Sequence, residues 1–128
     1  MKDTYSDIGV AATLVPAVHA ATLKGTAVDL KGFNSATLVI NTGAIASSGL
    51  YDIVMQESDT TTDGDFADVA AGDLLGALPA GLAADTVYKQ GYKGTKRYVR
   101  AVITKQSGTS IAAGAVFVRG HASDAPVS

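Results

Sequence analysis

The feature of this sequence that most constrains its fold is a succession of short β-type segments separated by turn residues. Segments rich in Val, Ile, Thr and Tyr follow one another at spacings of roughly 8–15 residues. We expect about seven strands, at 26–30, 36–45, 50–58, 86–92, 96–104, 112–122 and, as a strand with a turn or a short helix, 66–78. The segment 105–110 should join the last two strands like a hairpin. In a chain of 128 residues this pattern predicts a single all-β domain, a β-sandwich or a barrel.

The first 24 residues do not share this regular pattern. Pro16 favours extended backbone before it, Gly9 disfavours a helix, and the apolar periodicity is weak. We therefore predict an extended N-terminal arm at 1–24, followed by the β-sandwich domain at 25–128.

The composition indicates a core built from small side chains. The hydrophobic fraction is 47%, but the chain has 14 Gly and no Trp. Contacts between subunits are expected to supply part of the stability of so light a core. The absence of cysteine excludes a disulfide framework and Cys-based zinc sites. No apolar run approaches the roughly 18 residues that would predict a membrane span, so no membrane partner is expected.

The charges are divided along the chain. No Lys or Arg occurs between Phe33 and Tyr88, where eight acidic residues lie, and no acidic residue occurs between Lys89 and Arg119, where seven basic residues lie. Two interpretations are open. Acidic and basic strands could be neighbours that neutralise each other within the fold. Alternatively, the molecule could have an acidic and a basic side that dock head to tail with copies or with a partner.

The basic segment at 89–100 raises the question of nucleic-acid binding. Strand alternation places Arg97 on one side of 96–104 and Lys96 and Arg100 on the other. A nucleic-acid platform needs its basic and aromatic residues on one face, and the pI of about 5.5 is not that of a basic domain. We expect no direct nucleic-acid contact. Instead, the arginines should pair with carboxylates of this chain or of a neighbouring subunit.

No pattern in the sequence predicts catalysis, a metal or a cofactor. The segment 59–65 resembles the start of a calcium loop, but position twelve of such a loop would be Ala70, where a glutamate is required. His19 and His121 have no companion at ligand spacing, and a nucleophile motif is absent. We therefore predict a protein that is not an enzyme.

Several short motifs follow one another in 27–45, 51–77 and 87–104. They are Asp-Leu-x-Gly-Phe, Asn-Thr-Gly, Gln-Glu-Ser-Asp with a following Phe-x-Asp-Val, and Gly-Tyr-x-Gly-x-Lys-Arg-Tyr-Val-Arg. In this order they resemble small proteins of tailed bacteriophages and related prophages, encoded in head-morphogenesis clusters close to the major capsid protein. The resemblance covers 26–122 and carries over no functional residue. It implies a virion structural role, as a head decoration or cement protein.

The expected function is therefore to bind the outside of the phage head and bridge neighbouring capsomers. The expected partners are the major capsid protein and copies of this chain, in a trimer on the capsid surface after synthesis in the bacterial host cytoplasm. The expected capsid or subunit contacts, besides the arm, are Lys89, Lys93, Lys96, Arg97, Arg100, Asp59, Asp63 and Asp65. Two alternatives stay open: a head–tail joining or tail protein, and a carbohydrate-binding β-sandwich, for which aromatic residues are few.

Overall fold

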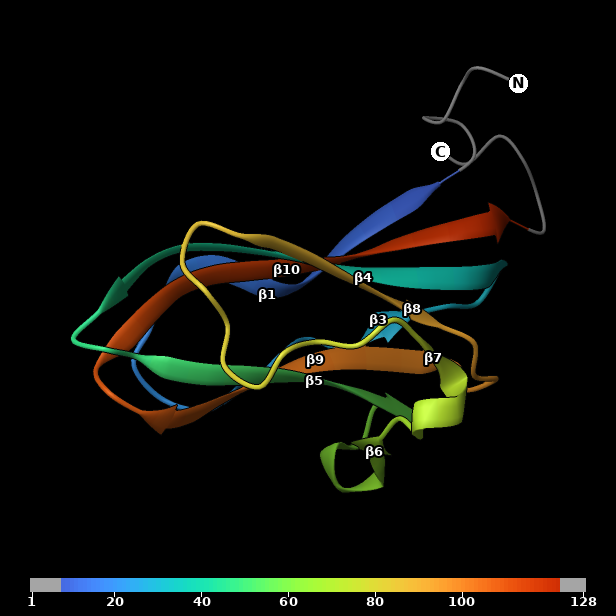
Figure 1. Cartoon of the computed structure of the whole chain (residues 1–128). Coiled ribbons are helices and arrows are strands. Elements are labelled where there is room, and N and C mark those ends of the chain that lie inside the picture. The colour runs from blue at the N-terminus through green and yellow to red at the C-terminus, as the bar shows by residue number, and fades with distance from the viewer. Residues whose placement is uncertain (1–7, 123–128) are drawn as a thin grey trace, which may run out of the picture.

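Two antiparallel β-sheets pack face to face in the computed structural model, which describes residues 8–122 (Figure 1). Sheet I has the order β1 (Gly9–His19), β10 (Ser110–Ala122), β4 (Phe33–Ala46), β8 (Val87–Tyr92), β7 (Leu74–Leu75). Sheet II has the order β2 (Leu23–Lys24), β9 (Tyr98–Ser107), β5 (Leu50–Ser58), β6 (Ala67–Asp68), and β3 (Val28–Asp29) also pairs with β9. The predicted all-β sandwich is confirmed. Both sheets are open, so the fold is not a barrel.

Strand alternation decides which residues enter the core. In β4, Leu38 and Ile40 are fully buried, whereas their neighbours Thr37 and Val39 are partly exposed on the outer side of sheet I. Sheet II contributes Tyr51, Met55, Val99 and Ile103, each 1% exposed or less. Burial of these apolar side chains between the sheets is the main force that holds the two layers together.

The predicted strand or short helix at 66–78 consists of two short strands and a turn. The 3₁₀ turn η2 (Asp63–Asp65) precedes β6, which pairs with β5 in sheet II. The 3₁₀ turn η3 (Ala71–Asp73) then leads into β7, which pairs with β8 in sheet I. The segment therefore carries the chain from one sheet to the other. No helix among residues 8–122 is long and apolar enough to cross a membrane.

The predicted N-terminal arm is corrected for most of its described part, residues 8–24, because Gly9–His19 is strand β1 of sheet I. Leu14 is 1% exposed in the core, and β1 pairs along β10 from Gly9 to His19. The register shifts between Ala12 and Leu14 and between Leu14 and Ala17. Such bulges break the two-residue alternation, which explains the weak periodicity of the sequence. Residues 1–7 of the predicted arm lie outside the described residues.

A buried threonine ties β1 to sheet II. Thr13 is 2% exposed; its Oγ1 donates to the carbonyl of Thr26 at 2.8 Å and accepts the amide of Ala101 at 3.0 Å. Because Ala101 belongs to β9, this side chain joins the two layers at the bulge. Pro16 lacks an amide hydrogen, which β1 tolerates because it is the edge strand of sheet I.

The predicted hairpin connection at 105–110 is also corrected. The strands on either side of it, β9 and β10, belong to different sheets. Gly108, with a φ of 77°, turns the chain from sheet II to sheet I. The β4–β5 connection makes the reverse crossing at Ser47 and Ser48, which also have positive φ angles. Both crossings lie at the same end of the sandwich, where the strands bend around in Figure 1.

Candidate functional site

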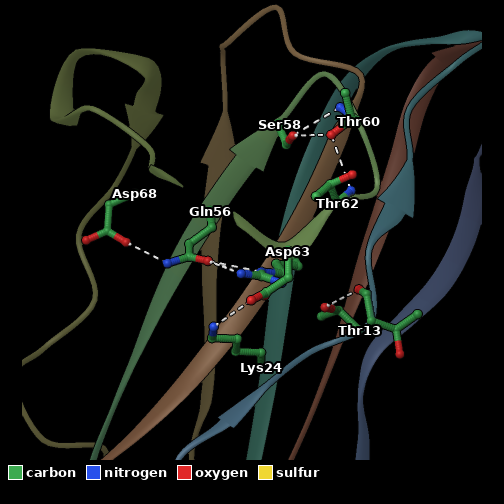
Figure 2. A network of polar contacts seen from close by, with 10 residues as sticks. Thr13, Lys24, Gln56, Ser58, Thr60, Thr62, Asp63 and Asp68 are labelled. Carbon is green, nitrogen blue, oxygen red and sulfur yellow. Dashed lines mark hydrogen bonds and ion pairs between the residues drawn. The ribbon is translucent and has the colours of Figure 1, made fainter. Parts of the chain in front are cut away.

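The charged face of the molecule is formed by the outer side of sheet II and the loop 59–66 that covers it. Most of the residues predicted as contacts lie here. Figure 2 shows the polar network around one of them, Asp63. The loop follows β5, and the basic residues lie in β9 or directly before it. β5 pairs with β9 from Leu50 to Ser58. The acidic loop begins directly after Ser58, so it lies over the basic strand β9.

Arg100 of β9 organises this face from beneath. Its Nε and Nη2 donate to Oε1 of Gln56 at 3.0 and 2.8 Å, and its Nη1 donates to Oδ1 of Asp63 at 2.7 Å. The guanidinium carbon lies 4.1 Å from the centroid of the Phe66 ring. The residue is 6% exposed. A planar guanidinium satisfied by oxygen acceptors in its plane and by an aromatic ring over its face is a favourable arrangement for a buried arginine.

The network continues outward from Arg100 on both sides. Lys24 of β2 forms an ion pair with Asp63, with 2.9 Å between Nζ and Oδ2, and Gln56 donates through Nε2 to Oδ1 of Asp68 at 3.0 Å. Asp63 therefore accepts from two basic side chains of two different strands. These contacts hold the turn η2 over sheet II and join the side chains of the neighbouring strands β5 and β6.

The loop 59–66 is also ordered by bonds within itself. Thr60 donates through Oγ1 to Oδ2 of Asp65 at 2.6 Å, and its amide donates to Oγ of Ser58 at 3.0 Å. The amide of Thr62 donates to Oγ1 of Thr60 at 3.2 Å. Short hydroxyl and carboxylate side chains commonly close turns in this way.

Two exposed ion pairs lie at one end of sheet II. Lys96 pairs with Asp59, with 3.0 Å between Nζ and Oδ2. Arg97 donates through Nε and Nη2 to the two carboxylate oxygens of Asp29, at 3.0 and 2.9 Å. The four side chains are 41–65% exposed. They are therefore available to a partner while already held in defined positions.

The ion pairs shift the pKa values of their members. The Arg97 guanidinium lowers the pKa of Asp29 to about 2. Hydrogen bonds from Lys24 and then Arg100 lower the pKa of Asp63, and the bond to Asp59 raises the pKa of Lys96. Each shift favours the charged form, so these pairs stay ionised around neutral pH.

The structure thus brings five of the eight predicted contact residues into ion pairs within the chain. They are Lys96, Arg97, Arg100, Asp59 and Asp63. This arrangement agrees with the interpretation that acidic and basic segments neutralise each other. Asp65 lies in the same loop, and Lys93 is exposed between β8 and β9. Lys89 lies apart from them, exposed on the outer side of sheet I.

Several residues that build this face were not found from the sequence. Lys24, Asp29, Gln56 and Phe66 come from distant positions. The last three stand in the quoted motifs, but the resemblance assigned no role to any residue of those motifs. Opposite charge was the one signal in the sequence for the partners of the basic residues. It restricts those partners to acidic residues but does not select among the twelve in the chain. Arg100 was expected to contact a partner, but its burial assigns it to positioning the loop instead.

The described residues contain no group of three or more His, Cys, Asp or Glu side chains placed to hold a metal ion. The two histidines lie on different parts of sheet I. His19 is buried, with Nε2 at 2.9 Å from the carbonyl oxygen of Ala113, and His121 is exposed, with Nδ1 at 2.8 Å from Oγ of Ser35.

No protein-family profile matches the chain, and no curated protein does so either. A solved structure described as that of infectious bursal disease virus Gx strain contains a chain of similar fold, with a TM-score of 0.46 and 15% sequence identity. The match covers 93% of the present chain and 33% of the viral chain, so the present chain spans about a third of that chain's length. We draw no functional argument from a similarity at this level.

Proposed function

We propose that this protein is a virion structural protein that binds the outside of a bacteriophage head as a decoration or cement protein. In this role the charged face docks on the major capsid protein and each copy contributes to bridging neighbouring capsomers. The motif order in 27–104 supports the proposal by its resemblance to proteins encoded beside phage capsid genes. Shell binding reinforces the head because many modest contacts act together.

The observation that carries the proposal is the exposed, prearranged charge on sheet II. Asp59 and Asp63 keep 65% and 60% of their side chains exposed although each is bonded to a basic residue. Side chains that are already fixed lose little conformational entropy when a partner binds. The loop that carries them is held from below by Arg100, so the face offers a rigid polar surface to a polar shell.

The proposal is tested by mixing the purified protein with expanded, undecorated heads and sedimenting the mixture through a gradient. We expect co-sedimentation that saturates at a ratio set by the symmetry of the shell. Lys96→Glu should weaken binding about tenfold or more, because it reverses a charge on the docking face. Lys89→Glu is the matched control: it makes the same change of net charge on the other sheet and should bind like the parent.

Protein that stays at the top of the gradient while the heads pellet would refute head decoration. Head–tail joining or tail structure would then be examined with isolated connectors and tails. If Lys89→Glu and Lys96→Glu weakened binding equally, head binding would stand but docking through the charged face would be wrong.

A further inference from the structure

The outer side of sheet I differs from the charged face in being neutral over most of its area and mainly apolar, with Thr37 and Asn41 of β4 among its polar residues. Six valines from four neighbouring strands lie on it: Val10, Val18, Val39, Val87, Val116 and Val118. Val18, Val87 and Val10 are 69%, 65% and 57% exposed. We call this surface the apolar face. Single exposed valines are ordinary on a protein surface, whereas a contiguous set of them marks an interaction site.

The register of sheet I shows that the apolar face is continuous. Val10 pairs with Val118, which pairs with Thr37 of β4. In the next row, Val116 pairs with Val39. Directly opposed side chains in a sheet lie about 5 Å apart, so these residues contact one another across strands.

The centre of the apolar face has a glycine that leaves room for a proline of the neighbouring strand. Gly114 of β10 lies under Pro16, and a Cβ at this position would come within 2.9 Å of the proline Cγ. An open recess of about 630 Å³ follows this part of sheet I, lined by residues that include Val18, Val39 and Val116.

The apolar face carries a single charged residue among those described, Lys89, and that residue lies at its border. Lys89 pairs with Val39, and β8 is the outermost strand at this level because β7 pairs only with Gly91 and Tyr92. A long lysine side chain at such a border can keep its ammonium in water while the centre is covered. The face can therefore be buried without desolvating a charge.

The lack of charge at the centre of the apolar face indicates what kind of surface can cover it. A charged partner surface would lose its hydration on the apolar face and find no counter-charge there. The matching surface in this molecule is the same face of a second copy, which is equally neutral and apolar. Of the other large exposed apolar residues, Val15 and Leu75 also belong to strands of sheet I. Those of sheet II, Leu23, Leu50 and Val54, are only 37–48% exposed.

The size of the apolar face is sufficient for pairing. Four strands spaced about 4.8 Å apart and four outward-facing rows about 6.7 Å apart give a footprint on the order of 500 Å². Two such faces together would bury on the order of 1,000 Å², which is the lower limit for a specific interface.

We propose that two copies of this chain pair through their apolar faces around a two-fold axis. The two outer sides of sheet I would stack about 10 Å apart, as sheets do within a sandwich. Such an interface uses the same patch on both copies, whereas the trimer expected from the sequence would need a second, different apolar patch. The pair turns its two charged faces outward in opposite directions. If the proposed function holds, one charged face of the pair docks on the shell and the other points away from it.

Sedimentation analysis of the full chain over about 1–100 µM tests the pairing. We expect a dimer. Val18→Asp and Val87→Asp lie on opposite sides of the apolar face and should each weaken dimerisation about a hundredfold or more, because both copies would bury a carboxylate. Leu23→Asp, an exposed apolar position on sheet II, is the matched control and should leave the dimer intact. Unfolding curves of all variants check that the fold is kept.

A parent protein that is monomeric throughout, or a dimer that Leu23→Asp weakens as much as Val18→Asp, would overturn the pairing. A trimer that survives both Asp substitutions on the apolar face would do the same. The gradient experiment keeps the two proposals separate. If the parent is a monomer that binds heads and Val18→Asp abolishes that binding, the apolar face contacts the shell and the pairing is wrong. If the parent is a dimer that does not bind heads, the pairing stands and the proposed function is wrong.

Discussion

At the scale of single residues, the most informative side chain is Arg100. It lies on the outward side of β9, a position that alternation marks as exposed, yet it is 6% exposed. It is buried because Phe66 and Asp63 close over it from a loop that is remote in sequence. Arg100 was predicted to contact a partner; in the structure it instead supports the loop whose exposed side chains are available to a partner.

Replacing Arg100 should reveal this structural role. We expect Arg100→Met to lower the free energy of unfolding by about 1–3 kcal/mol, because Gln56 and Asp63 lose a buried donor. Lys96→Met removes an exposed pair and should cost less than about 1 kcal/mol. Urea unfolding measures both values. Equal, small losses would contradict the assigned role of Arg100.

A second buried polar residue, Tyr92, makes the stability depend on alkaline pH. Its hydroxyl donates to Oε1 of Glu57 at 2.6 Å and accepts the amide of Lys96 at 3.1 Å. Burial, reinforced by the bond to the Glu57 carboxylate, raises the pKa of Tyr92 above its ordinary value of 10. The folded state therefore favours the neutral phenol, and its contribution to stability is present below pH 10 and declines as the pH rises beyond it.

The expected consequence is a steeper alkaline loss of stability in the parent than in Tyr92→Phe. At neutral pH the variant should be less stable by about 1 kcal/mol, since it lacks the hydroxyl bonds. Between about pH 9 and pH 11 this difference in stability should narrow. Over that range Tyr92 of the unfolded parent loses its proton more readily than Tyr92 of the folded parent, which favours the unfolded state. Urea midpoints at the two pH values provide the measurement, and a constant difference would argue against a perturbed Tyr92.

At the scale of elements, β1 changes the interpretation of the N-terminal region. The strand covers one edge of the sandwich with Leu14 and binds sheet II through Thr13. Its bulges place two register shifts within eleven residues. For this reason, the strand has no two-residue pattern that a sequence analysis could detect.

Leu14→Ala distinguishes a packed strand from an arm. Because Leu14 is 1% exposed, its truncation should cost about 2–5 kcal/mol. Val15, its neighbour in β1, is 68% exposed, and Val15→Ala should change the stability by about 0.5 kcal/mol or less. Chemical unfolding compares the two variants. A small loss of stability for Leu14→Ala would contradict the packed strand and support the predicted arm.

At the scale of the whole molecule, the two layers give the protein two unlike surfaces. Sheet II and its loop carry the ion pairs, while the outer side of sheet I is apolar. Salt screens interactions between exposed charges but does not weaken apolar association. The two proposed interfaces should therefore respond differently to ionic strength.

Raising the salt from about 0.05 M to about 0.5 M should weaken head binding about tenfold or more. Over the same range, the dimer constant should stay unchanged or tighten. Gradient binding and sedimentation at both salt concentrations give the two responses. A dimer that dissociates in salt would show that charges, and not the apolar face, hold the copies together.

The fold class followed from residue types, because spaced β-branched segments with turn residues between them leave few alternatives to stacked sheets. The strand Leu50–Ser58 coincides with its predicted range. Charge pairing between the acidic and basic segments was one of the two interpretations that the sequence left open, since opposite charges on neighbouring strands attract. Local sequence alone thus determined that this chain forms short strands around a light core.

Tertiary structure alone decided which sheet each strand joins, which side faces outward and which charges meet. In β10, both sides are apolar, with Ala115 and Phe117 on one side and Val116 and Val118 on the other. Only the packing of sheet II against the first side makes the second a surface. Arg100 and Asp63 are 37 residues apart and meet because the register of β5 with β9 brings them together. Long-range pairing of this kind depends on the whole assembled core, and no single segment encodes it.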